Sequence, residues 1–222
     1  MEQINYKREL IFLPLLILPL IYIAYVWGQL PDRIAIHFGF DGTPNGWGSK
    51  WMIFLLPAVN IGAYLLILFL PQIDPKRMNN ENFNSMFYKI RLALVFFLCF
   101  MCFLATDAAV KGSINKGISN WVPVGLFLFL SLMGNFMINI KPNWFIGVRT
   151  PWTLSSDTVW RKTHQVVGRL WFYGGLLCAV LSILAPHEWT EGLILTFTLG
   201  SAVFAFGYSF WLFKKEKENT AV

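Results

Sequence analysis

The sequence predicts an all-α, polytopic membrane protein with six transmembrane helices. Only 14% of its 222 residues are charged, whereas a soluble domain carries about 25%. Several windows of about 18 or more apolar residues are each long enough to cross a bilayer. Helices are expected because each one satisfies its own backbone hydrogen bonds in lipid. The alternating segments of roughly ten residues that are typical of a membrane barrel are not seen.

The apolar segments expected to span the membrane are 10–27, 51–70, 90–110, 121–140, 167–185 and 191–213. Residues 1–9 are too long and too charged for the start of a signal peptide. No small-residue cleavage motif follows them, so we interpret the first segment as an uncleaved helix. We divide the chain into an N-terminal two-helix region, 1–72, and a four-helix region, 90–213.

The distribution of basic residues predicts how the chain is oriented. Fourteen of the eighteen Lys and Arg residues fall on the side of the two termini, and four fall on the other side. Basic loops stay in the cytoplasm, so both termini and residues 141–170 are predicted to be cytoplasmic. Residues 29–50 then face outward. The net charge of +6 thus indicates topology and contact with anionic membrane lipids, not direct binding of nucleic acid.

Residues 29–50 are predicted to form a short, extended, Gly-rich lid on the outer membrane surface. Apolar side chains alternate along 33–38 as in a short strand, with Ile34, Ile36 and Phe38 on one side. Asp41–Gly42 and Asn45–Gly46 are turn signals. The candidate functional residues of the lid are Pro31, His37, Gly42 and Lys50.

His37 suits either a contact to an external ligand or a hydrogen bond that anchors the lid. A single histidine with no nearby carboxylate pair makes a poor metal site, so no metal is expected there. Asp107, close to the outer end of its span, is near enough to the boundary to reach water. Cys99 and Cys102 lie within an apolar span, where packing is expected instead of redox chemistry.

Residues 141–170 are the longest polar break in the second half, and we call them the signature segment. Pro142 and Pro151 disfavour helix in the residues before them, which predicts an irregular loop as far as Leu154. Ser155, Ser156 and Asp157 offer helix N-caps. An amphipathic helix is predicted to follow and to run into the fifth span. Its apolar face comprises Val159, Trp160, Thr163, Val167, Leu170 and Trp171, and its polar face Arg161, Lys162, Gln165 and Arg169.

The signature segment admits a structural and two functional interpretations. It could simply orient the fifth span. Arg149, Thr150 and Trp152 place a cation, a hydroxyl and an aromatic plane close together, which suits a carboxylate or phosphate. His164 and Asp157 invite a catalytic interpretation, but they are two helical turns apart. No activated Ser or Cys and no metal-binding motif accompanies them, so no cofactor or metal is expected.

The sixth span carries a stripe of small residues, Ser201, Ala205 and Ser209. Small residues at four-residue spacing allow helices to approach closely. The stripe fits packing within one chain and homo-oligomer formation equally well.

The signature segment resembles that of the SdpI family of bacterial toxin-immunity integral membrane proteins. The matching residues are Asn143, Gly147, Arg149, Thr150, Pro151, Trp152, Thr153, Leu154, Val159, Trp160, Thr163, His164 and Gly168. The lid resembles a domain of unknown function that often precedes the SdpI region, matched at Leu30, Pro31, Ile34, His37, Gly42 and Lys50.

The resemblance implies a multi-pass protein of the bacterial cytoplasmic membrane that is not an enzyme. Such a protein confers resistance to a secreted antimicrobial peptide toxin. It also implies signalling, in which a small cytoplasmic winged-helix repressor is held at the membrane when toxin is present. Two alternatives are a membrane enzyme that uses His164, Asp157 and Arg149 on a lipid headgroup or peptide, and a peptide transporter. The two halves show no convincing internal repeat, which ranks the transporter below the receptor.

Overall fold

The computed structural model describes residues 6–39, 43–74, 81–112, 121–184 and 189–220. The long helices are α2 (Phe12–Val26), α3 (Leu55–Ile73), α4 (Glu81–Lys111), α6 (Trp121–Met137), α8 (Asp157–Leu184) and α9 (Trp189–Thr220). The shorter elements are α1 (Tyr6–Glu9), η1 (Trp27–Gln29), β1 (Arg33–Phe38), β2 (Pro44–Ser49), η2 (Lys50–Phe54) and α7 (Pro151–Ser155).

Five of the described helical segments are long and apolar enough to cross a membrane. They are 7–29, 50–73, 84–111, 157–184 and 189–219. Helix α6 is also apolar but has 17 residues, about 26 Å at 1.5 Å per residue. The predicted class, a mainly helical multi-pass membrane protein, is confirmed. The predicted amphipathic helix forms the first turns of α8 and continues into the predicted fifth span, as expected. The predicted irregular loop ends at Thr150 and not at Leu154, because a capping box and Pro151 begin the short helix α7.

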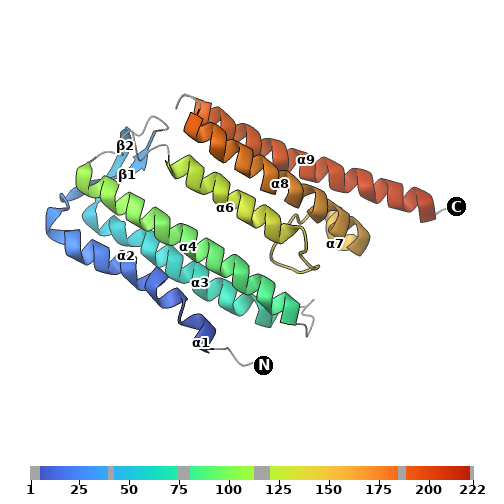
Figure 1. Ribbon diagram of the computed structural model, residues 1–222, viewed down its shortest axis with the longest axis horizontal. Coiled ribbons are helices and arrows are strands. Elements are labelled where there is room, and N and C mark those ends of the chain that lie inside the picture. Colours follow the sequence, from blue (N-terminus) through green and yellow to red (C-terminus); the bar gives the residue numbers. More distant parts are fainter. Residues whose placement is uncertain (1–5, 40–42, 75–80, 113–120, 185–188, 221–222) are drawn as a thin grey trace.

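The helices lie side by side in two groups (Figure 1). Helix α4 packs against α2 and α3, and α8 packs against α6 and α9. Helix α4 also contacts α6 and so joins the groups. The two chain ends and α7 lie at one end of the bundle, and β1 and β2 lie at the other (Figure 1). The signature segment and the lid are therefore at opposite ends of the molecule.

Glycines allow α6 and α8 to approach until their backbones touch. A Cβ on Gly134 would lie 2.7 Å from the carbonyl oxygen of Gly168, and a Cβ on Gly168 would lie 2.8 Å from that of Gly134. One hydrogen bond crosses the same contact, because Ser131 Oγ donates to the Phe172 carbonyl at 2.8 Å. Small residues serve this purpose between membrane helices. The contact fixes where α8, and hence His164, stands relative to the end of α6.

The predicted strand at 33–38 is confirmed, and it pairs antiparallel with β2. The predicted single apolar face is wrong, because Ile34 and Ala35 are both buried while Ile36 is 45% exposed. The cause is an irregularity in the pairing after Ala35, since a bulge changes which face the following residues occupy.

Next to the two strands, the Gly39 N–H donates to the Thr43 carbonyl at 2.8 Å. The prediction of a turn at Asn45–Gly46 is wrong, because both residues belong to β2 and Gly46 pairs with His37 of β1. The other turn signal, Asp41–Gly42, lies outside the described residues.

The hairpin is fixed at its base and along its buried side. Lys50 Nζ is 3.1 Å from Asp32 Oδ1, and the Lys50 N–H donates to the Asp32 carbonyl at 3.0 Å. Ile34 packs in a buried cluster with Ile23, Leu30, Ile53 and Ala109. The lid is thus held against the ends of α2, α3 and α4.

Candidate functional site at the signature segment

Asn143 holds the irregular loop between α6 and α7 in shape. Its side chain is fully buried. The amide Nδ2 donates to the carbonyls of Lys141 and Ile146 at 3.0 and 2.9 Å. The amide oxygen accepts from the N–H groups of Phe145 and Ile146 at 2.8 and 2.6 Å. All the hydrogen-bonding capacity of the side chain is therefore used within the loop.

The loop is also tied to the first group of helices. The N–H of Trp144 donates to Asp74 Oδ2 at 3.0 Å. Asp74 follows directly after α3 and is 4% exposed. No local sequence pattern marks Asp74, because its partner lies seventy residues further along the chain.

Thr150 and Thr153 form a capping box at the start of α7. The Thr153 N–H donates to Thr150 Oγ1 at 3.2 Å, and the Thr150 N–H donates to Thr153 Oγ1 at 3.0 Å. Pro151 occupies the first helical turn, where its missing N–H costs nothing. Thr150 Oγ1 also donates to Ser209 Oγ of α9 at 3.0 Å. Both threonine hydroxyls are buried and serve the fold, so they are not free to bind an anion.

His164 is fully buried and fixes the loop to α8. Its Nδ1 donates to the Trp160 carbonyl at 2.7 Å, and its Nε2 accepts from the N–H of Val148 at 2.8 Å. These partners define a neutral imidazole with its proton on Nδ1. The ring stacks on that of Trp160 with centroids 4.1 Å apart. Trp160 in turn donates through Nε1 to the Ile140 carbonyl at 3.0 Å.

Gly147 lies against the His164 ring with φ at +119°. This backbone conformation is one that residues with side chains rarely adopt. A Cβ on Gly147 would lie 2.4 Å from His164 Nε2. Gly147 therefore allows the loop backbone to pass close enough for Val148 to reach the imidazole.

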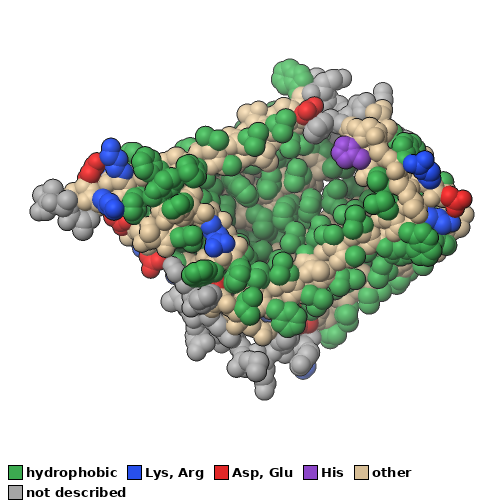
Figure 2. Space-filling view, turned by 180° about the vertical axis from the view of Figure 1, so that it is seen from behind, with side chains coloured by type: hydrophobic (Ala, Val, Ile, Leu, Met, Phe, Trp, Pro, Cys, Tyr) green, Lys and Arg blue, Asp and Glu red, His purple; other side chains and the backbone are tan. Residues whose placement is uncertain are grey.

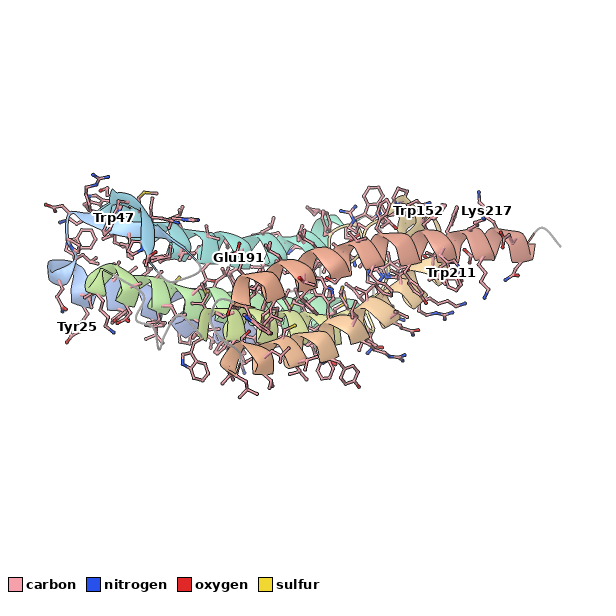
Figure 3. All side chains as sticks on the ribbon, turned by 90° about the horizontal axis from the view of Figure 1, so that it is seen from above. Tyr25, Trp47, Trp152, Glu191, Trp211 and Lys217 are labelled. Carbon is pink, nitrogen blue, oxygen red and sulfur yellow. The ribbon has the colours of Figure 1, made fainter. Side chains whose placement is uncertain are left out.

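Trp152 joins the start of α7 to α9. Its ring lies 4.8 Å from that of Phe206 and 4.9 Å from that of Phe210, measured between centroids. Figure 3 shows Trp152 near the part of α9 that leads to Trp211 and Lys217, far from Trp47 of the lid. Thr163 is fully buried, and its hydroxyl has no hydrogen-bond partner among the described residues.

The residues proposed for catalysis are not brought together. Both His164 nitrogens are engaged by the backbone, whereas Arg149 and Asp157 are exposed. Within the described ranges, no group of three His, Cys, Asp or Glu side chains is arranged to hold a metal ion. The geometry assigns His164 to the scaffold. Arg149 is one of the exposed cations of the signature segment.

An apolar cavity of about 770 Å³ lies at the lid end of the bundle. The lid lines it through Ile36 and His37, and the starts of α3, α6 and α9 and the C-terminal part of α4 complete the wall. Hydrophobic side chains also line the hollowed middle of the face shown in Figure 2. The side chain of His37 on β1 makes a polar contact across the hairpin, where its Nδ1 is hydrogen-bonded to Oδ1 of Asn45 on β2. Pro31 is exposed at the hairpin base next to Asp32, the partner of Lys50.

A second polar cluster connects α1 with α3 and α4. Arg91 Nη2 is 2.5 Å from Glu9 Oε1, and Tyr64 Oη donates to Glu9 Oε2 at 2.9 Å. The Arg91 guanidinium lies 4.8 Å from the ring centroid of Phe12 and 5.7 Å from that of Tyr88. By sequence, Arg91 is one of the basic residues on the predicted cytoplasmic side. Its pairing with Glu9 crosses too long a stretch of sequence for any local pattern to indicate.

These features define a helical multi-pass membrane protein with a hydrogen-bonded loop at one end and a β-hairpin at the other. Residues 139–209 match the model of the SdpI/YfhL protein family, and residues 15–61 match that of a domain of unknown function, DUF1648. The chain therefore contains an SdpI/YfhL region preceded by a DUF1648 region, as the resemblance indicated. Comparison with curated proteins and with solved structures gave no match.

The family assignment bears directly on location and role. The SdpI/YfhL match, together with several long apolar helices, identifies a multi-pass protein of the cell membrane. At the level of the family it supports a toxin-immunity protein and not an enzyme. The matched region begins just after α6 and covers the signature loop, α7, α8 and much of α9. The loop geometry described above therefore lies within the family region.

Proposed function

We propose that this protein protects a bacterial cell from a secreted antimicrobial peptide toxin and reports the toxin to the cytoplasm. In this proposal the chain crosses the membrane six times with both termini inside. The lid faces outward, and the signature segment presents itself to a small winged-helix repressor. The excess of basic residues on the side of the termini supports this orientation.

The toxin is proposed to enter the cavity beneath the lid. At about 770 Å³, this cavity is within the range of roughly 300–1,000 Å³ that is usual for ligand pockets. Its wall combines Ile36 of the lid with Met52, Met101 and Ile194. A peptide that acts on membranes carries apolar side chains, and these would gain from leaving water in such a site.

The observation that carries the signalling proposal is that the loop is bonded to both helix groups at once. Its Trp144 N–H binds Asp74 beside α3, and its Thr150 hydroxyl binds Ser209 of α9. The lid cavity is also lined by helices from both groups. A ligand that favours one spacing of the groups would therefore favour one arrangement of the loop, through its different affinity for the two states.

The loop offers exposed side chains to a cytoplasmic partner. Arg149 is exposed, and Trp144 and Phe145 are 49% and 36% exposed. Tryptophan and arginine are enriched among the residues that contribute most to protein interfaces. These side chains, and not the buried Thr150, Thr153 or His164, are the proposed contacts to the repressor.

The test is made in a toxin-sensitive host that expresses the chain and a fluorescent winged-helix repressor. With toxin added, the parent protein should preserve the membrane potential and draw the repressor to the membrane. Arg149→Gln should reduce recruitment several-fold while the protein stays in the membrane and still protects. Lys162→Gln, which removes another exposed cation of the segment, is the matched control and should recruit normally.

Three results would refute parts of the proposal. Loss of membrane potential in cells expressing the parent protein would refute immunity. Normal recruitment by Arg149→Gln would remove this residue from the docking surface. Recruitment that does not depend on toxin would refute signalling while leaving immunity in place.

A further inference from the structure

A polar groove of about 960 Å³ lies at the signature-segment end of the bundle, between α4, the end of α6 and the start of α8. Three cations from three segments line it: Lys89 of α4, Lys141 after α6 and Arg161 of α8. All three side chains are exposed. Among the residues that the structure describes, none of the three forms a salt bridge. Their charges are therefore available to a ligand.

The described lining of this groove carries a surplus of positive charge. Asp157 is its acidic residue, so three cations and one carboxylate leave a formal charge of +2. Asp157 is also the first residue of α8, where a carboxylate interacts favourably with the helix N-terminus. The surplus favours an anion.

The lining also provides hydrogen-bond donors and an apolar wall. The side-chain amides of Asn139 and Gln165 can donate to phosphate or glycerol oxygens. Met86 and Phe136 supply apolar surface beside them. This combination suits a ligand with a charged head and an apolar body.

The length of α6 fits a groove at the level of the lipid headgroups. Its 17 residues span about 26 Å, close to the hydrocarbon thickness of about 30 Å. In the proposed six-span arrangement, the end of α6 lies near the boundary of the membrane core. Lys141 and Asn139 follow this end directly.

We propose that this groove, which we call the basic groove, binds the phosphate group of an anionic phospholipid. Lys89, Lys141 and Arg161 contact the phosphate, and the glycerol and acyl portions lie toward Met86 and Phe136. Basic pockets between transmembrane helices on the cytoplasmic side are known to hold such headgroups. This site is separate from the lid cavity and does not depend on the toxin-immunity proposal.

The test uses the full chain, purified in detergent and titrated with phosphatidylglycerol or with phosphatidylcholine of the same acyl chains. Bound lipid is counted by native mass spectrometry. The parent should bind phosphatidylglycerol about tenfold more tightly than phosphatidylcholine. Combined Lys89→Gln, Lys141→Gln and Arg161→Gln should abolish this preference. The matched control, Lys162→Gln with Arg169→Gln and Lys214→Gln, removes the same charge from exposed positions outside the groove and should keep it.

Several outcomes would overturn the proposal. Equal binding of the two lipids by the parent would do so without any variant. If the control variant lost its preference for phosphatidylglycerol to the same extent, the overall positive charge of the protein, and not the groove, would account for lipid binding. Displacement of phosphatidylglycerol by millimolar inorganic phosphate would make the ligand a soluble ion. If the triple variant does not fold, Lys141→Gln and Arg161→Gln are measured singly, and each should weaken phosphatidylglycerol binding several-fold.

Discussion

His164 Nε2 occupies the place where a side chain on Gly147 would stand, 2.4 Å from an added Cβ. The two residues are seventeen positions apart, one in the loop and one on α8. The close approach lets Val148 donate its N–H to the imidazole at 2.8 Å. Gly147 and His164 therefore depend on each other. The glycine leaves space for the imidazole, and the imidazole accepts the hydrogen bond that holds the loop.

Gly147→Ala is expected to destabilise the protein. The alanine would have to adopt φ near +119° and would collide with His164, and such strain costs on the order of 1–3 kcal/mol. Thermal unfolding in detergent should show a lower midpoint. Gly200→Ala is the control, since a Cβ there meets nothing within 4 Å and lies in helix α9, where alanine is favoured. Equal midpoints for Gly147→Ala and the parent would contradict the assignment.

His164→Ala is expected to loosen the loop. It removes the acceptor of the Val148 N–H and the stacking partner of Trp160. Leaving a buried donor unsatisfied costs about 1–3 kcal/mol. Hydrogen exchange should become faster at Val148. A catalytic histidine would give a different result, namely unchanged protection at Val148 with loss of a chemical turnover.

Thr163→Val is expected to be neutral or stabilising, unlike the substitutions above. The Thr163 hydroxyl is buried without a partner among the described residues, and valine has nearly the same shape. Removing an unsatisfied polar group can raise stability by about 1 kcal/mol. Unfolding midpoints of parent and variant provide the measurement. A clear loss of stability would show that the hydroxyl has a partner that the described residues do not include.

Local sequence patterns predicted the long helices and β1, because the length of an apolar run and the alternation of apolar side chains can be recognised within a short stretch of sequence. The Ser-Ser-Asp capping signal was also informative, since Ser156 Oγ accepts the N–H of Val159 at 3.2 Å. The predicted turn at Asn45–Gly46 is wrong because both residues lie in β2, where Gly46 pairs with His37. Thus tertiary pairing, not local preference, decided their conformation.

The sequence predicted where the candidate site lies in the chain, but not how its side chains are arranged. Because Arg149 and Trp152 are close to it in the sequence, Thr150 was predicted to be part of an anion site. In the fold its hydroxyl faces Ser209, a residue 59 positions away that the sequence suggested only as part of a packing stripe. Asp74 and Glu9 were missed for the same reason. Long-range hydrogen bonds leave no periodic trace in a single sequence.

The buried pair Glu9–Arg91 supports a prediction on how the first helix group is held together. The side chains are 16% and 6% exposed. Removing one partner leaves the other charge poorly solvated, which costs about 3–5 kcal/mol. Glu9→Met and Arg91→Met are therefore each expected to lower the unfolding midpoint strongly. The Tyr64 hydroxyl, which donates to Glu9, adds to the loss when Glu9 is replaced.

The double variant Glu9→Met/Arg91→Met separates the ion pair from the packing. Because no charge is then left buried, the double variant should lose less unfolding free energy than the two single variants together, by about 1–3 kcal/mol. Chemical unfolding of all four proteins in the same detergent gives this coupling free energy. The matched control cycle uses Asp32→Ala and Lys50→Ala, an ion pair in which Asp32 is 94% exposed. Its coupling should stay below about 1 kcal/mol. Additive costs in the Glu9–Arg91 cycle would mean that the aromatic rings of Phe12 and Tyr88, and not the carboxylate, hold the guanidinium in place.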